Sequence, residues 1–132
     1  MSIKTNKAIV NRIFEEIFNN RNMAVIEELI APNYINHNAS IQVQGPEGVK
    51  RMATAQFKAF PDFYTTIEDI IAERDKVVVR ATDHFTHQPD GKKITLSWIE
   101  ILRLEKGKAV EAWSEADLSS VIEQLKGSLT EE

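Results

Sequence analysis

In the first half of the chain, apolar residues recur with the period of an amphipathic helix. Between residues 10 and 18 they share one helical face, namely Val10, Ile13, Phe14, Ile17 and Phe18. A shorter helix follows "NNRN", with Asn22 as its predicted N-cap, and we expect it to end before Pro32. "NYINHN" then predicts a short strand. Gly45-Pro46-Glu47 predicts the start of a third helix, which Pro61 ends, because proline is favoured at the first helical position.

From Tyr64 onward the period changes to two, which is typical of strands. We predict strands at about 64–73, 76–87, 93–105 and 108–116, with turns at Arg74-Asp75, Pro89-Asp90-Gly91 and Lys106-Gly107. A closing helix is predicted in "SSVIEQL", with Ser120 and Glu123 as an S-x-x-E capping box. Helices followed by an antiparallel meander predict an α+β fold, with three N-terminal helices packed on a sheet of four to six strands.

Composition restricts the classes of protein that the chain can belong to. Its 132 residues, 42% hydrophobic and 27% charged, predict one domain spanning residues 1–132. No apolar run approaches the roughly 18 residues that span a membrane, and the first residues lack a secretory pattern, so we expect a cytoplasmic protein. A net charge of −4, with no stripe among 16 basic residues, argues against a nucleic-acid partner. The absence of cysteine excludes disulfides and thiol chemistry.

The segment "EAWSEAD", residues 111–117, places acids and an indole at alternate positions. On a strand, Glu111, Trp113, Glu115 and Asp117 share one face. A two-residue loop at Lys106-Gly107 predicts the pairs Glu105–Lys108, Glu100–Trp113, Trp98–Glu115 and Leu96–Asp117. These pairs predict a pocket in which two indoles flank a carboxylate, unless a bulge shifts every pairing.

Other polar residues leave alternatives open. Arg80 lies in the buried-looking "VVVRAT", where it either faces the pocket and binds a substrate carboxyl or enolate, or pairs with Glu68 or Asp69. Trp98 and Trp113 either stack on a substrate or fill the core.

Metal and paired-acid chemistry find little support in the spacing of the polar residues. His84 and His87 lie three residues apart and point to opposite faces of a strand, so no metal site is predicted. Glu115 and Asp117 lie about 7 Å apart, as in some glycosidases, but nothing else in the chain supports that chemistry. Glu111 lies roughly 20 Å from Asp117, too far to act with it.

An ordered set of segments resembles one family over nearly the whole chain, from about residue 5. The segments are "YINH" (34–37), "GPEGVKRM" (45–52), "FPDF" (60–63), "TIEDIIAERDKVVVR" (66–80), "GKAVEAWSEAD" (107–117) and "VIEQLKG" (121–127). They resemble the SnoaL-like polyketide cyclases (ester cyclases) of the nuclear transport factor 2-like superfamily. This resemblance implies a cone-shaped fold in which three helices and a curved antiparallel sheet enclose a pocket, often in a homodimer. It also implies chemistry without a metal or cofactor, with Asp117 as acid/base in an aldol closure. One departure is "ATDHFTHQPDG", where relatives carry G-T-H-x-G; His87 takes the place of that histidine.

We therefore expect a cofactor-free lyase or isomerase that acts on a small apolar or aromatic carbonyl compound, with Asp117 as the catalytic residue. The expected substrate-binding residues are His37, Gln56, Phe57, Phe60, Arg80, His87, Trp98 and Trp113. The alternative is a non-catalytic small-molecule-binding or dimeric interaction module of the same fold. We also expect a homodimer through the outer face of the sheet, because strand 93–105 carries apolar side chains on both faces. The substrate, and the choice among cyclisation, isomerisation, dehydration and hydrolysis, stay open.

Overall fold

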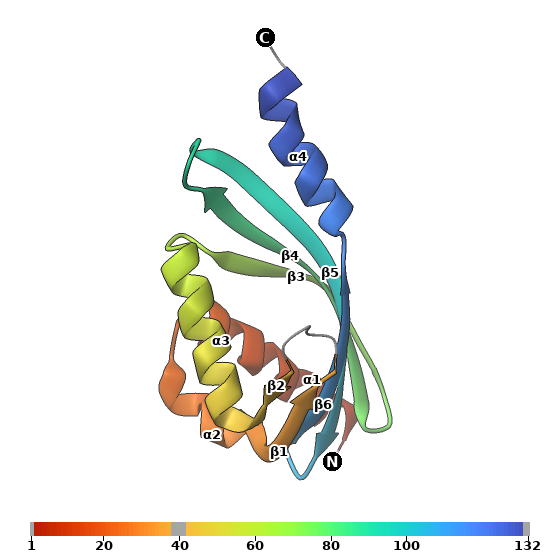
Figure 1. The fold of residues 1–132 in the computed structure, drawn as a ribbon. Helices are drawn as coiled ribbons and strands as arrows, with labels where there is room; N and C mark the ends of the chain where they lie inside the picture. The colour runs from red at the N-terminus through yellow and green to blue at the C-terminus, as the bar shows by residue number, and fades with distance from the viewer. Residues whose placement is uncertain (1, 38–41, 131–132) are drawn as a thin grey trace.

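A computed structural model describes residues 2–37 and 42–130, with side chains up to residue 126. Within these two ranges, four α-helices and six strands follow one another (Figure 1). The first half contains α1 (Ile3–Arg12), the π-helix η1 (Ile13–Asn19), the 3-10 turn η2 (Met23–Val25), α2 (Ile26–Leu29), β1 (Ile30–Asn36), β2 (Val43–Gln44) and α3 (Gly45–Ala59). The second half contains β3 (Tyr64–Glu73), β4 (Lys76–His87), β5 (Lys92–Glu105), β6 (Lys108–Ala116) and α4 (Leu118–Thr130).

The strands form one curved sheet in the order β2-β1-β6-β5-β4-β3. Strands β3 to β6 form the predicted antiparallel meander, with bounds that agree with the sequence prediction to within one residue. The strand predicted in "NYINHN" is β1, which pairs in parallel with β6 and makes the sheet mixed. The predicted α+β fold is therefore confirmed, with one parallel pair added to the antiparallel meander.

The turn between β5 and β6 has the backbone geometry that its sequence predicts. Lys106 and Gly107 both adopt positive φ angles, 51° and 79°. Two central residues with positive φ define the two-residue hairpin turn whose twist matches that of the flanking strands. Glu105 and Lys108 accordingly face each other across the turn.

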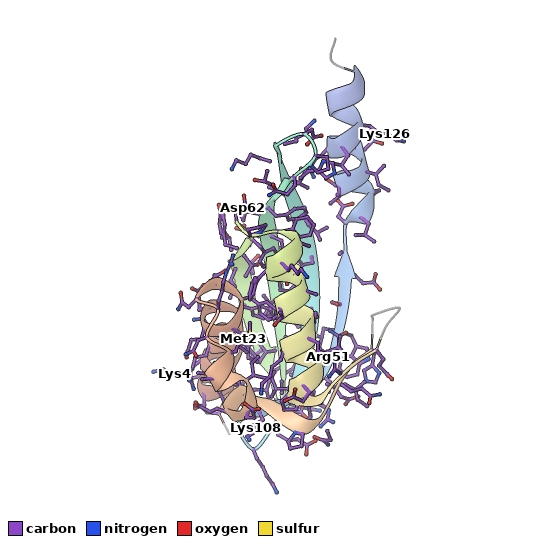
Figure 2. All side chains as sticks on the ribbon, turned by 60° about the vertical axis from the view of Figure 1, so that its left-hand side comes forward. Lys4, Met23, Arg51, Asp62, Lys108 and Lys126 are labelled. Atoms are coloured by element: carbon purple, nitrogen blue, oxygen red, sulfur yellow. The ribbon has the colours of Figure 1, made fainter. Side chains whose placement is uncertain are left out.

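The core lies between the N-terminal helices and the concave face of the sheet. The apolar stripe predicted for residues 10–18 is buried, with Val10 and Ile17 fully enclosed. Its second half forms a π-helix, a wider helical turn that is often found at functional sites. Helix α3 covers the same concave side: it lies to the left of the sheet in Figure 1 and in front of it in Figure 2. Asn22 caps η2 as predicted, its side chain accepting a hydrogen bond from the Ala24 amide.

Helix α4 begins three residues earlier than the capping-box prediction. Asp117 is its N-cap: Oδ1 accepts hydrogen bonds from the Ser120 amide and the Ser119 hydroxyl, each 3.1 Å long. Ser120 therefore lies in the first turn, and the predicted role of Ser120 as the cap is wrong. Aspartate caps helices because its carboxylate satisfies amides that lack a helical partner.

The same helix projects beyond the rest of the molecule and is held against β5 (Figure 1). The Gln124 side chain accepts a hydrogen bond from the Thr95 amide at 2.9 Å and donates one to the Thr95 carbonyl at 2.8 Å. Lys126, further along α4, points away from the sheet (Figure 2). Within the described residues, none of the helices has the length and apolar character needed to cross a membrane.

Candidate functional site

A β-bulge decides which side chains of β6 face the interior. Leu104 pairs with Ala109 and Arg103 pairs with Glu111, so Val110 is an extra residue in the hairpin. Because side chains alternate between faces, one extra residue moves every later side chain of β6 to the other face. The pairings predicted for Trp98, Glu100 and Leu96 with β6 are therefore wrong.

The observed pairing places small residues, rather than acids, on the inner face of β6. Trp98 pairs with Ala116, and Glu100 pairs with Ser114. Trp113 instead pairs with Ile101 on the outer face, where its indole stacks on the imidazole of His37 with ring centroids 5.2 Å apart. The prediction that His37 and Trp113 point into the pocket is wrong.

Glu111 ties this outer cluster together. Its carboxylate accepts a hydrogen bond from Arg103 Nε at 2.7 Å, and its other oxygen lies 2.8 Å from His37 Nε2. The hydrogen bond from Arg103, followed by that of His37, lowers the pKa of Glu111 below its ordinary value. As predicted, Glu111 lies outside the pocket.

The other charged candidates also lie outside the cavity. Asp117 is exposed and caps α4, so its predicted position in the pocket is wrong. Arg80 is on the outer face, where its Nε donates to Asp69 at 2.7 Å and both side chains are more than half exposed. The structural alternative for Arg80 is thus the observed one. His87 lies near the β4–β5 hairpin, 3.0 Å from Asp90.

The aromatic candidates on and after α3 pack beside the cavity. Phe57 contacts Phe63, and the Arg21 guanidinium lies 4.4 Å from the centre of the Phe57 ring. Phe60 packs on Phe85 with ring centroids 4.5 Å apart. Phe57 and Phe60 therefore pack behind the cavity that lies between α3, η1 and the sheet, and neither lines it.

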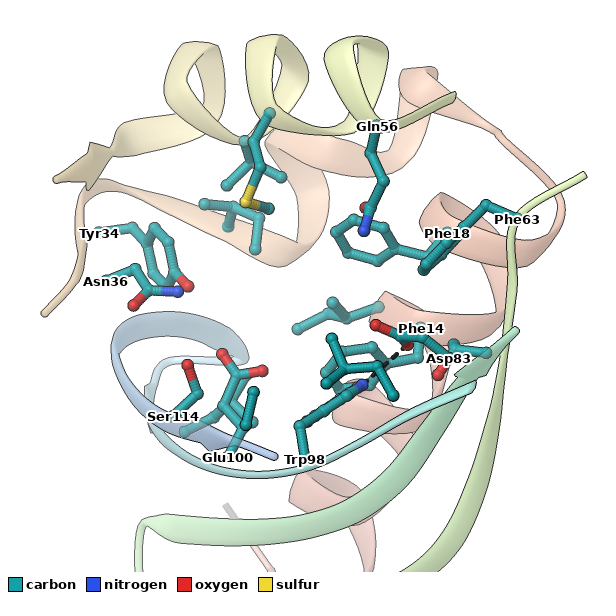
Figure 3. Close-up of a pocket in the computed structure, with 18 residues that line it drawn as sticks. Phe14, Phe18, Tyr34, Asn36, Gln56, Phe63, Asp83, Trp98, Glu100 and Ser114 are labelled. Atoms are coloured by element: carbon teal, nitrogen blue, oxygen red, sulfur yellow. Dashed lines mark hydrogen bonds between the residues drawn. The ribbon is translucent and has the colours of Figure 1, made fainter. Parts of the chain in front are cut away.

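A cavity of about 230 Å³ lies between α3, η1 and the concave face of the sheet (Figure 3). Of the candidates from the sequence, Gln56 and Trp98 line it. Gln56 points down from α3, and Trp98 rises from β5 opposite. The remaining lining residues are Ile13, Phe14, Phe18, Ile30, Tyr34, Asn36, Val49, Met52, Phe63, Thr65, Asp83, Leu96, Glu100, Leu102, Ser114 and Ala116.

Aromatic rings form much of one wall. Phe14 and Phe18, both on η1, stack with ring centroids 6.0 Å apart, and Phe14 lies 5.2 Å from Trp98. Residues four apart lie on the same side of a helix. The local helix geometry therefore presents two phenyl rings to the cavity beside the indole.

Asp83 lies at one end of this wall (Figure 3). It is only 8% exposed, and its Oδ1 accepts a hydrogen bond from Trp98 Nε1 at 2.8 Å. Burial raises the pKa of Asp83, while the hydrogen bonds from Trp98 and Thr65 oppose that rise by favouring the ionised form. The indole N–H thus holds this carboxyl in a fixed orientation.

Glu100 lies on the floor, on the opposite side of Trp98 from Asp83 (Figure 3). No hydrogen bond or ion pair joins its carboxyl to another described residue. Burial, and secondarily the charge of Asp83, raise the pKa of Glu100 from 4.5 to about 8. Tyr34 borders the same space; burial raises the pKa of its hydroxyl, so the group stays protonated and shares a hydrogen bond with Asn36.

The sequence contained a signal for both acids. Asp83 continues the inward series Val77, Val79 and Ala81 on β4. Glu100 likewise stands between Trp98 and Leu102 in the inward phase of β5. An acid in phase with a buried apolar stripe is costly unless it serves a site, so the position of both residues in these stripes is the signal that points to them.

The described lining has a distinctive charge balance. It contains two carboxyl groups and no lysine, arginine or histidine. Within the described part of the chain, no three metal-ligating side chains converge on one point. The polar groups that face the cavity are carboxyls, hydroxyls and amides, which suit proton transfer and hydrogen bonding.

Helices packed on the concave face of a curved mixed sheet, with a pocket between them, define a nuclear transport factor 2-like α+β protein. The chain belongs to the SnoaL-like polyketide cyclase family, whose sequence profile matches residues 8–125. Comparison with curated protein sequences gives no match.

Solved structures support the same fold. A candidate polyketide cyclase from Bacillus cereus is 29% identical, with a TM-score of 0.77 over 89% of this chain and 77% of that protein. IdmH from Streptomyces antibioticus is 23% identical, with a TM-score of 0.80 over 91% of this chain and 97% of IdmH. TsrD from Streptomyces laurentii is 20% identical, with a TM-score of 0.81 over 95% and 97% of the two chains.

Proposed function

We propose that the protein is a cofactor-free acid/base enzyme that acts on a small carbonyl compound, with Glu100 as the residue that takes and returns a proton. The observation that carries this proposal is the position of Glu100. It is a carboxyl without a described partner, on the floor of an apolar cavity, with its pKa raised to about 8. A carboxylate of that basicity is a far better proton acceptor than an ordinary one, and it is partly ionised near neutral pH.

The reaction that fits these groups is proton abstraction next to a carbonyl group. The Glu100 carboxylate takes the α proton, the electron pair of the C–H bond forms a C=C bond, and the carbonyl electrons move to oxygen. The Tyr34 hydroxyl, a neutral donor beside Glu100, is placed to donate a hydrogen bond to that enolate oxygen. In a cyclisation, the enolate carbon then attacks a second carbonyl, and the oxygen of that carbonyl takes the proton from Glu100. In an isomerisation, Glu100 returns the proton to a different carbon of an extended enolate.

Cavity size restricts the substrate. Pockets for drug-sized ligands span about 300–1,000 Å³, whereas this cavity measures about 230 Å³. The proposed substrate therefore has one or two rings, and stacks on Trp98 and the two phenyl rings of η1.

A second candidate is the non-catalytic binding module. One observation favours it: Asp117, which matches the acid/base of the characterised cyclases, is outside the cavity and caps a helix. The two candidates differ in whether the cavity only holds a carbonyl compound or also exchanges its protons.

Exchange of the α protons of acetophenone in heavy water, followed by NMR, separates these candidates. We expect the protein to accelerate exchange, with a rate that rises with pH and levels off above about 8. Glu100→Gln should lower the rate by about a hundredfold. Glu115→Gln is the matched control, because Glu115 is exposed on the outer face.

Two other results would redirect the assignment. Exchange that survives Glu100→Gln but is lost in Asp117→Asn would return the acid/base role to Asp117. Binding of acetophenone, seen as a shift of the Trp98 indole N–H signal, without any exchange would favour the binding module.

We further propose that the protein works as a homodimer joined through the outer face of the sheet. Ile99, Ile101 and Tyr64 are 49%, 37% and 50% exposed on that face. Ile71, 63% exposed, Val78 and Ile101 also lie side by side across β3, β4 and β5, and contiguous exposed apolar surface is typical of an interface.

A further inference from the structure

We infer that the cavity selects a ligand that carries a basic amine beside its ring, and that Asp83 is the residue that binds the ammonium group. This inference rests on the proposed function only in that the same cavity takes the substrate. It assigns separate tasks to the two acids: Asp83 holds the cation, and Glu100 handles the proton of the reacting carbon.

The first support is the setting of Asp83. It is buried, it lines the cavity, and it accepts hydrogen bonds from two neutral donors, Trp98 and Thr65. The adjacent His84, which stacks on Tyr64, has the smallest effect on the pKa of Asp83. No described lysine, arginine or histidine forms an ion pair with it. A buried carboxylate without a counter-charge is costly, and an ammonium group supplies that charge together with further hydrogen bonds.

The aromatic wall supplies the second support. Trp98 donates its N–H to Asp83, so the ring that carries this N–H lies beside the carboxylate, and Phe14 packs 5.2 Å from it. The faces of aromatic rings attract cations, indole most strongly. A carboxylate flanked by an indole and a phenyl ring is therefore a favourable site for an ammonium group attached to a hydrophobic body.

The charge of the whole lining points in the same direction. Two carboxyls and no described basic side chain face the space. A carboxylate or phosphate ligand would meet like charge in a poorly solvated site, without a cation to compensate for it. Anionic ligands are thus disfavoured, contrary to the expectation that Arg80 binds a substrate carboxyl. That arginine lies on the outer face.

Equilibrium binding of three matched probes tests the inference: benzylamine, benzyl alcohol and benzoate. Binding is followed by NMR through the indole N–H signal of Trp98. We expect benzylamine to bind about tenfold more tightly than benzyl alcohol, and benzoate to bind most weakly. Asp83→Asn preserves the shape and can still accept from Trp98, so it should abolish the amine preference while leaving benzyl alcohol unchanged. Asp69→Asn, on the outer face, is the control and should change nothing.

Each contrary result overturns the inference. Equal affinities, tighter binding of benzoate, an amine preference that persists in Asp83→Asn, or no binding of any probe at millimolar concentration would each do so. The outcome is separate from the fate of the proposed function, because no turnover is measured. An enzyme that exchanges α protons through Glu100 but shows no amine preference would refute only the inference about Asp83. A protein with the preference but no exchange would refute only the catalytic proposal.

Discussion

At the scale of single residues, the two cavity acids differ in how they are held. Asp83 is fixed by an indole N–H, whereas no described residue forms a hydrogen bond or ion pair with the carboxyl of Glu100. Burial therefore disfavours the ionised form of Glu100. The folded protein should lose stability at pH values at which that carboxyl is ionised. A carboxyl whose position on the cavity floor lowers stability is more typical of a functional residue than of a structural one.

The first prediction concerns the pH dependence of stability. Below the ordinary pKa of 4.5, Glu100 is protonated in both the folded and the unfolded chain. Between 4.5 and about 8 the unfolded chain loses the proton that the folded chain keeps, so the free energy of unfolding falls as the pH rises. Glu100→Gln removes this loss. Between about pH 4 and about pH 9, we expect the free energy of unfolding of the variant to rise by roughly 2 kcal/mol relative to that of the native protein. This is less than the full pKa shift implies, because Glu100 is partly exposed.

Urea unfolding at a series of pH values measures this difference. Glu115→Gln, exposed on the outer face of the neighbouring strand, should give a difference that stays constant with pH. A constant difference for Glu100→Gln as well would show that its carboxyl titrates normally.

The second prediction concerns Asp117, which caps α4. Asp117→Ala removes the acceptor of the Ser120 amide and should weaken α4 by about 1 kcal/mol. Hydrogen exchange should accelerate in residues 118–126 and stay unchanged in η1 and α3. Asp117→Ser, which can still cap, is the control and should keep most of the protection. Slower ligand binding without faster exchange in α4 would instead support a place for Asp117 in the site.

At the scale of elements, the sequence predicted the strands well and their faces poorly. Periodicity and turn residues located β3 to β6 because those signals are local, and the Lys106-Gly107 turn has the predicted geometry. The bulge at Val110 depends on how β6 packs against β5 and β1, which a local pattern does not contain. One extra residue turned the side chains of Glu111, Trp113 and Glu115 to the outer face and left Ser114 and Ala116 to line the cavity. Trp98 and Gln56 were placed correctly because neither depends on the register of β6.

The third prediction tests that bulge. Deleting Val110 would restore the register predicted from the loop and turn Glu111, Trp113 and Glu115 inward. Burying two unpaired acids in the core costs several kcal/mol, so we expect the deletion variant to be unfolded or to re-form the bulge elsewhere. Val110→Ala keeps the register and should cost roughly 1–2 kcal/mol. Circular dichroism and urea unfolding distinguish the two. A deletion variant with native stability would show that the bulge does not set the face of β6.

At the scale of the whole molecule, the proposed homodimer depends on the outer face of the sheet. The fourth prediction is that the native protein sediments at about twice its 15.0 kDa chain mass at micromolar concentration. Ile99→Lys combined with Ile101→Lys should convert it to monomers, since lysine ammonium groups cannot be buried between two apolar faces. Ile122→Lys, on exposed α4, is the control and should leave the mass unchanged. A native protein that sediments as a monomer at this concentration would remove the dimer from the proposal.

The contact between Gln124 and Thr95 has a consequence for solubility. Strand β5 continues past the end of β6, and its outer rim would otherwise offer free peptide groups to a strand of another molecule. The side-chain amide of Gln124 forms hydrogen bonds with both the backbone amide and the carbonyl of Thr95, as a neighbouring strand would. The backbone amide of Asp117 likewise donates to the Ser97 carbonyl at 2.9 Å. On β3, at one end of the sheet, an irregular register near Glu68 and exposed acids discourage the same approach. Strand addition and fibril growth are thus hindered along these two rims.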